Sequence, residues 1–202
     1  MRKLFDIGGI IAGAVLIIFG AAAIYMGVDG RTTVRDSLKQ EQITIGSIDD
    51  PVVAQFASKY AGQQVTNGDQ ARAFAQVIRG HTLKITGGLT YAQMGRFLSA
   101  DDPKSLAGTS DETAALKDEQ GNPVANATRN TWVTATALST ALNTSYMAEQ
   151  TALFGIVVGI ALLLSGIGFI VLTLALGGAL ARRESIEVAK HEAGLKTKVV
   201  TT

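Results

Sequence analysis

Two uncharged apolar stretches flank a polar middle in this chain. Residues 153–176, LFGIVVGIALLLSGIGFIVLTLAL, contain neither charge nor proline, and residues 7–28 have the same character. A helix rises about 1.5 Å per residue, so a helix over 153–176 reaches about 36 Å, enough to cross a hydrocarbon core of about 30 Å. The pattern predicts transmembrane helices at residues 7–28 and 152–180.

The first apolar stretch has an alternative interpretation as a signal peptide. It follows the basic start Met1-Arg2-Lys3, and the small residues at 21–23 offer a crude cleavage site. The uncharged run is longer than the usual signal core of about 7–15 residues. We therefore favour an uncleaved transmembrane helix.

The polar middle, residues 29–151, shows helical rather than alternating periodicity. Residues 29–42 continue the first helix, with Asp29-Gly30 as a candidate break. Asp50 and Pro51 are typical of the N-cap and first position of a helix over 51–61. A second helix over 68–85 follows, with an apolar stripe. The stripe consists of Ala71, Phe74, Ala75 and Ile78, and extends to Thr82 and Ile85.

The second half of the middle region is more polar before it becomes helical again. Thr90 can cap a short helix over 91–98, and a surface excursion over 100–123 holds one short helix near 110–117. From Asn126 one helix should enter the second apolar stretch without a joint. Its apolar stripe consists of Trp132, Ala135, Leu138, Leu142, Tyr146 and Leu153.

These elements predict an all-α membrane protein, an antiparallel hairpin of two transmembrane helices that extends into an extracytoplasmic helical bundle. The parts are a cytoplasmic N-terminus (1–6), the first span (7–28), the helical domain (29–151), the second span (152–180) and a cytoplasmic tail (181–202).

Basic residues predict the orientation in the membrane. They lie before the first span and after the second span, as expected of cytoplasmic segments. These residues are Arg2, Lys3, Arg182, Arg183, Lys190, Lys196 and Lys198. Arg31, Arg35 and Lys39 oppose this assignment because they closely follow the first span. We expect a plasma-membrane protein with two spans and both termini in the cytoplasm.

Glycines recur along both apolar stretches, and those of the first stretch share one helix face. In the first stretch one pair is four residues apart and later ones follow at sevens, which allows close helix packing. We assign to packing between the spans Gly9, Gly13, Gly20, Gly27, Gly155, Gly159 and Gly166. Packing against the other span of the same chain is favoured, and homo-oligomerisation is the alternative.

Composition excludes several kinds of chemistry. The chain has no cysteine, two histidines and a net charge of +1. On the predicted topology His81 and His191 lie on opposite sides of the membrane, so a facial triad of two histidines and a carboxylate cannot form within one chain. No nucleotide-binding glycine motif or G-x-S-x-G sequence is present, and the charge gives no case for nucleic-acid binding. We expect no catalytic residues, no metal and no cofactor.

One set of side chains in the middle region is a candidate patch for a partner or an anionic ligand. It consists of Arg72, Arg79, His81, Tyr91 and Arg96. A solvated helix face is the simpler interpretation.

Four segments resemble an uncharacterised actinobacterial family of two-span membrane proteins. They are ARAFAQVIRGHTLKITGGLTYAQMGRF (71–97), RNTWVTATALSTALNTSYMAEQ (129–150), the opening MRKLFDIGGIIAGAVLIIFG and GRTTVRDSLKQEQI. The resemblance implies an actinobacterial plasma membrane and a helical outer domain. Members often carry the label "aromatic ring-opening dioxygenase", which implies a non-haem iron site whose ligands this sequence lacks. The resemblance therefore supplies no catalytic residues.

The sequence leads to three functional hypotheses, and the third of them is a hydrolase or metal-dependent enzyme that acts outside the membrane and depends on His81. The first is a non-enzymatic integral membrane protein that is an accessory or interaction subunit of a cell-envelope assembly, with the lipid bilayer and other membrane or envelope proteins as partners. The alternative is an extracytoplasmic sensor or ligand-binding module that signals through a separate partner.

Overall fold

In the computed structural model, the backbone is described for residues 2–200 and the side chains for 7–178 and 186–187. The elements in order are α1 (Arg2–Gln40), α2 (Pro51–Phe56), the 3-10 helix η1 (Ser58–Tyr60), α3 (Gly68–Ile85), the 3-10 helix η2 (Tyr91–Gln93) and α4 (Ala127–Val200). Over residues 2–200 there are helices and isolated β-bridges but no β-strand. The all-helical prediction is therefore confirmed.

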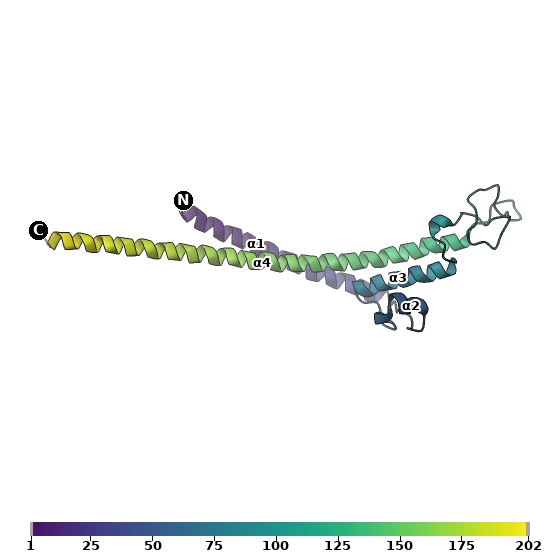
Figure 1. Cartoon of the computed structure of the whole chain (residues 1–202), viewed down its shortest axis with the longest axis horizontal. Helices are drawn as coiled ribbons and strands as arrows, with labels where there is room; N and C mark the ends of the chain where they lie inside the picture. The colour runs from purple at the N-terminus through teal and green to yellow at the C-terminus, as the bar shows by residue number, and fades with distance from the viewer. Residues whose placement is uncertain (1, 201–202) are drawn as a thin grey trace. The chain divides into compact units, whose positions relative to one another are not determined.

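The chain divides into two compact units. One, here called the apolar helix pair, combines Met1–Val28 with Ala152–Thr202, and the other, here called the middle unit, is Asp29–Thr151. Helices α1 and α4, which Figure 1 labels, each have residues in both units. The side chains of the seven basic residues used to predict the orientation, and that of His191, lie outside the described residues.

Helices α1 and α4 each contain a stretch long and apolar enough to cross a membrane. Many large apolar side chains there are exposed, including Phe19 (64%), Phe154 (68%) and Leu164 (62%). A core helix of a water-soluble protein would bury such side chains. Helix α1 continues through the candidate break at Asp29-Gly30. Helix α4 continues through residues 149–151, so the prediction that it enters its apolar stretch without a joint is confirmed.

A small apolar core holds the middle unit together. Its buried members come from α1, α2, α3, α4 and the loops between them. They are Leu38, Ile45, Val53, Ala57, Val65, Ala71, Ala73, Ala75, Val77 and Leu142. Helix α3 is buried on more than one face, since alternate residues such as Ala73, Ala75 and Val77 are all covered. Val77, outside the predicted stripe, is therefore buried, whereas Ile85, the last residue of α3 and part of the predicted stripe, is 61% exposed.

Helices α2 and α3 begin where the sequence predicts. The Asp50 carboxylate accepts a hydrogen bond from the Val52 amide, with Pro51 in the first helical turn. The Asn67 side chain accepts from the Gln70 amide and caps α3. The predicted helix over 51–61 is shorter, because α2 ends at Phe56 and a 3-10 turn follows before Gly62.

The helices predicted over 91–98 and near 110–117 are wrong. Only the 3-10 turn η2 forms, and the chain beyond it is extended and joined by isolated β-bridges such as Phe97 with Thr109 and Ser99 with Ala115. The backbone of Phe97 exchanges two hydrogen bonds with Thr109, of 2.9 and 2.8 Å. Gly95 permits this approach, because a Cβ there would collide with the Thr109 backbone. Non-local pairing has displaced the local helical preference.

Candidate functional site

A single buried carboxylate joins three helices of the middle unit. Glu149 on α4 is 6% exposed, and its Oε1 accepts from Nε of Arg31 at 2.9 Å and from Nε of Arg35 at 2.8 Å. Its Oε2 accepts from the amide of Gly68, the first residue of α3. We call these four residues the Glu149 centre.

The local sequence explains how each partner reaches the carboxylate. Arg31 and Arg35 are four residues apart on α1, so they lie on the same helix face. The amide of Gly68 lies in the first turn of α3 and has no partner within the helix. A Cβ at Gly68 would lie 2.9 Å from Cα of Tyr146, so only glycine allows α3 to approach α4 this closely.

The centre holds Glu149 in its ionised form. Burial is the largest single influence and raises the pKa of Glu149, because a charge loses stabilisation when it leaves water. The Gly68 amide and the two guanidinium groups act in the opposite direction. Together they hold the pKa below its ordinary value.

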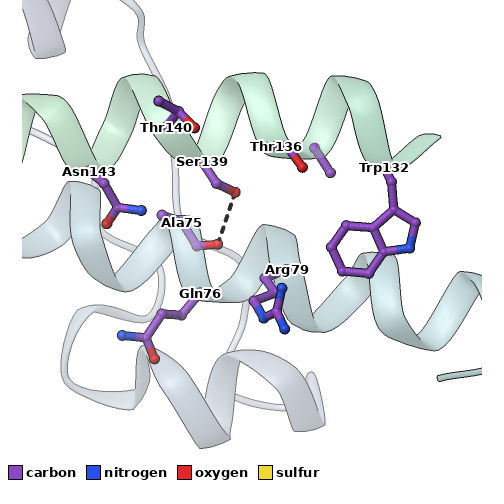
Figure 2. A pocket seen from close by; sticks show the side chains of 9 residues that line it. Ala75, Gln76, Arg79, Trp132, Thr136, Ser139, Thr140 and Asn143 are labelled. Carbon is purple, nitrogen blue, oxygen red and sulfur yellow. Dashed lines mark hydrogen bonds between the residues drawn. The ribbon is translucent and has the colours of Figure 1, made fainter. Parts of the chain in front are cut away.

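A polar groove lies between α3 and α4 in the middle unit (Figure 2). Its volume is about 230 Å³. Its lining residues are Ala75, Gln76, Arg79, Trp132, Ala135, Thr136, Ser139, Thr140 and Asn143. Ser139 anchors the two helices by donating to the carbonyl of Ala75 at 3.3 Å. The groove offers amide, hydroxyl and guanidinium groups for hydrogen bonding.

Trp132 closes one end of this groove. Its indole Nε1 donates to the carbonyl of Leu89 at 2.9 Å, and the guanidinium of Arg79 lies 5.4 Å from its ring centroid. At 5% exposure the ring is covered. Arg79 therefore serves first as a partner of Trp132, within the distance for a cation–π interaction.

An apolar groove of about 400 Å³ lies elsewhere in the middle unit. Residues of α1, α3, α4 and the loop after α1 line it. They are Ser37, Leu38, Glu41, Ile43, Phe74, Ile78, Leu138, Ala141, Leu142 and Ser145. Leu138 is 53% exposed, and Glu41 is the only charged residue of the lining. Phe74 and Ile78 of the predicted stripe thus line a groove and leave part of their surface open.

The five residues of the predicted patch have separate partners. Arg72 lies over the ring of Tyr146 at 4.8 Å, and the guanidinium of Arg129 lies over the ring of Tyr91 at 3.8 Å. His81 Nε2 lies 2.8 Å from the Asp50 carboxylate. Over residues 7–178, no hydrogen bond, ion pair or ring contact joins two of the five.

Arg96 and His81, the other two members of the predicted patch with charged partners, each contact an acidic side chain. Arg96 donates to the carbonyl of Ser110 at 3.2 Å and lies 3.8 Å from the exposed Glu112 carboxylate. The Val52 amide, followed by His81, holds the pKa of Asp50 below its ordinary value. His81 thus connects the end of α3 to the N-cap of α2. Arg96 connects two parts of the non-helical segment that follows η2, since its partners are Ser110 and Glu112.

The assigned packing glycines lie where α1 and α4 approach each other in the apolar helix pair. A Cβ at Gly13 would lie 2.7 Å from the carbonyl oxygen of Gly166, and one at Gly20 would lie 2.7 Å from that of Gly159. A Cβ at Gly27 would lie 2.6 Å from the carbonyl of Ala152.

The other assigned glycines differ in how closely they are approached. A Cβ at Gly9 would collide with the side chain of Thr173, whereas one at Gly155 would lie 3.8 Å from the nearest atom, the carbonyl oxygen of Ala23. Gly8 has no atom within 4 Å of its Cβ position.

The sequence did not point to the Glu149 centre. Its members are separated by up to 118 positions, so no local motif marks them. One available signal was that Glu149 is the only carboxylate between Ala127 and the second apolar stretch. Among the described residues, no group of three or more histidine, cysteine, aspartate or glutamate side chains is arranged to hold a metal ion.

Comparison with known proteins adds no relative. No protein-family model matches the chain, and neither a curated protein nor a solved structure matches it.

Proposed function

We propose that this chain is a non-enzymatic, two-span plasma-membrane protein whose middle unit binds another protein of the cell envelope. The apolar groove lined by Leu38, Phe74, Ile78, Leu138 and Leu142 carries this proposal. Its volume lies within the range of specific binding pockets. An apolar groove between helices suits the apolar face of a partner's amphipathic helix.

The exposed Leu138 side chain adds an energetic argument. Full burial of a leucine side chain contributes about 1.5–3 kcal/mol, so a partner that covers Leu138 recovers part of that free energy. The nearly uncharged lining supports a partner bound mainly through apolar contact, with Glu41 at the margin.

The membrane arrangement is an antiparallel hairpin of residues 7–28 and 152–180. The glycine contacts support it, because Gly13 approaches Gly166 while Gly27 approaches Ala152. Residue numbers therefore increase along one helix where they decrease along the other, as in an antiparallel pair. Small residues at such crossings allow the close packing that drives helix association in lipid. In this arrangement both helices continue into an extracytoplasmic helical bundle.

The Glu149 centre also supports the proposed orientation, with both termini in the cytoplasm. Arg31 and Arg35 follow the first span and would ordinarily favour the cytoplasmic side. Both are paired with Glu149 instead. Their role in holding the middle unit together accounts for basic residues on the outer side of the membrane.

Site-specific photo-crosslinking in intact cells tests the proposed groove. Leu138 and Val133 lie on the same helix and are 53% and 54% exposed, but only Leu138 lines the groove. A photoreactive residue at 138 should form an adduct with one envelope protein, and the same residue at 133 should not. The identified partner should co-purify with the wild type and Val133→Asp but not with Leu138→Asp. Equal adducts at both positions, or an adduct only with a second copy of this chain, would contradict the proposal.

The polar groove favours a second candidate function, a module that binds a small ligand. Its hydroxyl and amide groups, from Gln76, Thr136, Thr140 and Asn143, can orient a hydrogen-bonding molecule. Its volume is below that of most ligand pockets. A rise in the unfolding temperature of the full chain with a metabolite, lost in Asn143→Leu, would favour this candidate over the first.

A further inference from the structure

The charges of the Glu149 centre do not balance. Two guanidinium groups share one carboxylate oxygen, and the Gly68 amide adds the partial positive charge of a helix N-terminus. The nearby carboxylate of Asp36 is engaged by Lys39 at 3.0 Å. Over residues 7–178, neither arginine pairs with another acidic side chain. The centre therefore carries an excess of about one positive charge.

Both arginines keep N–H donors that the contact with Glu149 does not use. A guanidinium has five N–H donors, and each arginine uses only its Nε in the contact with Glu149. Over residues 7–178, neither Arg31 nor Arg35 donates a hydrogen bond from an Nη atom to another side chain or to the backbone. The side chains of Arg31 and Arg35 are 40% and 38% exposed, so solvent reaches both of them.

The shared carboxylate also fixes the two guanidinium groups. Because both Nε atoms donate to Oε1, the two groups converge on one point from positions four residues apart on α1. A guanidinium that is already oriented loses less entropy when it binds an anion. Phosphate oxygens match the fork of N–H groups that each arginine still presents.

The place of the pair in the chain indicates the source of the anion. Arg31 comes three residues after Val28, the end of the uncharged run, and Arg35 one turn later. A helix that leaves the hydrocarbon core at this point enters the headgroup layer, where basic side chains meet lipid phosphates.

We propose that Arg31 and Arg35, held by Glu149, bind the phosphate group of an anionic phospholipid in the leaflet that adjoins the middle unit. This inference rests on the proposed membrane arrangement. The lipid neutralises the excess charge of the centre and ties the first turns of α1 beyond Val28 to the membrane surface. Free inorganic phosphate offers the same chemistry, and the experiment separates the two sources.

The test uses the full-length chain in a zwitterionic detergent and follows the unfolding temperature through the fluorescence of the single tryptophan. Phosphatidylglycerol should raise the unfolding temperature, whereas diacylglycerol, which lacks the phosphate, should not. Mass spectrometry of the intact complex should retain phosphatidylglycerol. Its affinity should fall about tenfold or more in Arg31→Gln and Arg35→Gln, since a hydrogen bond to a charged group contributes about 1.5–3 kcal/mol.

The control is Lys84→Gln, which removes an exposed cation of α3 and should leave lipid binding unchanged. If a glutamine variant loses its far-ultraviolet circular dichroism, Arg31→Lys and Arg35→Lys keep the charge and should still bind more weakly than wild type. Equal binding by wild type and the arginine variants, or equal shifts with diacylglycerol, would overturn the site. A full shift with inorganic phosphate alone would overturn the lipid as its source.

Failure of this inference is distinguishable from failure of the membrane arrangement. Extraction of cell membranes with alkaline carbonate reports on the arrangement, because integral proteins stay in the pellet. A chain that stays in the pellet but shows no preference for phosphatidylglycerol overturns the lipid site alone. Release into the supernatant overturns the arrangement itself.

Discussion

Arg35 and Glu149 are 114 positions apart in the sequence, yet Nε of the arginine lies 2.8 Å from Oε1 of the glutamate. With Arg31 and the Gly68 amide on the same carboxylate, this contact brings α1, α3 and α4 to one point of the middle unit. The relationship has consequences for stability, for the pH response and for the role of the first turns beyond Val28.

Glu149→Gln should destabilise the middle unit by about 2–3 kcal/mol. Removing one member of a buried ion pair costs about 3–5 kcal/mol, and partial exposure of both arginines reduces that cost. Urea titration of the full chain in detergent, followed by Trp132 fluorescence, measures the change. Glu119→Gln removes an exposed carboxylate and should change the unfolding free energy by less than about 0.5 kcal/mol. Similar effects of the two substitutions would refute a stabilising role for the centre.

The stability of the wild type and that of Glu149→Gln should depend differently on pH. The folded-state pKa of Glu149 is below the ordinary value of 4.5, so its ionised form stabilises the fold above that value. As the pH falls from about 5 through the lowered folded-state pKa, this stabilisation should disappear in the wild type. Because Glu149→Gln lacks the titrating group, its stability should approach that of the wild type at low pH. Contributions of Asp50 and Asp111, whose pKa values are also lowered, are common to both proteins and cancel. A constant difference down to pH 3 would contradict this assignment.

Gly20→Leu should disrupt the apolar helix pair, whereas Gly8→Leu should not. A side chain at Gly20 would meet the backbone at Gly159 and Leu163, while the Cβ position at Gly8 is open. Overpacking of this kind costs about 1–3 kcal/mol. Thermal melting in detergent, monitored by helical circular dichroism, should show a lower first transition for Gly20→Leu only. Unchanged melting of Gly20→Leu would show that the two helices do not pack at this glycine.

Arg79→Gln should expose Trp132, the single tryptophan of the chain. The loss of the cation–π contact costs about 0.5–1 kcal/mol, and removal of the guanidinium uncovers one ring face. Acrylamide quenching of tryptophan fluorescence should therefore increase. Arg72→Gln is the matched control, because Arg72 lies over Tyr146 instead and its loss should leave the quenching unchanged. An equal increase in both variants would indicate general loosening of the unit.

Local chemistry made the helix starts predictable. Asp50 with Pro51, and Asn67 before Gly68, are capping sequences whose hydrogen bonds form within three residues, so neighbouring residues alone specify them. The apolar stretches were predictable for the same kind of reason, because length and hydropathy alone decide whether a helix can cross a membrane.

The segment over 94–126 was not predictable, because its structure depends on distant partners. The helical spacing of Met94 and Leu98 was overridden when the Phe97 backbone paired with Thr109 and the Leu98 amide donated to Val124. Asn126 completes this arrangement by donating to the carbonyls of Gly95 and Leu106 from a fully buried position. None of these pairings leaves a periodic trace in the sequence.

The candidate sites were missed for a related reason. Arg31 and Arg35 were noticed only as exceptions to a charge rule, since nothing in the sequence relates them to Glu149. The predicted patch grouped cations by their place on helices, but Arg72 and Arg79 each cover a different aromatic ring of α4. Pairing across helices depends on the register of α1 and α3 against α4, which single-helix patterns do not contain.

We propose that the middle unit and the two termini lie on opposite sides of a membrane. Because the chain has no cysteine, single cysteines at Asp102 and Thr201 can be labelled without background. A membrane-impermeant maleimide should label Asp102→Cys in intact cells and label Thr201→Cys only after permeabilisation. Labelling of both positions in intact cells, or of Thr201→Cys alone, would contradict the two-span arrangement.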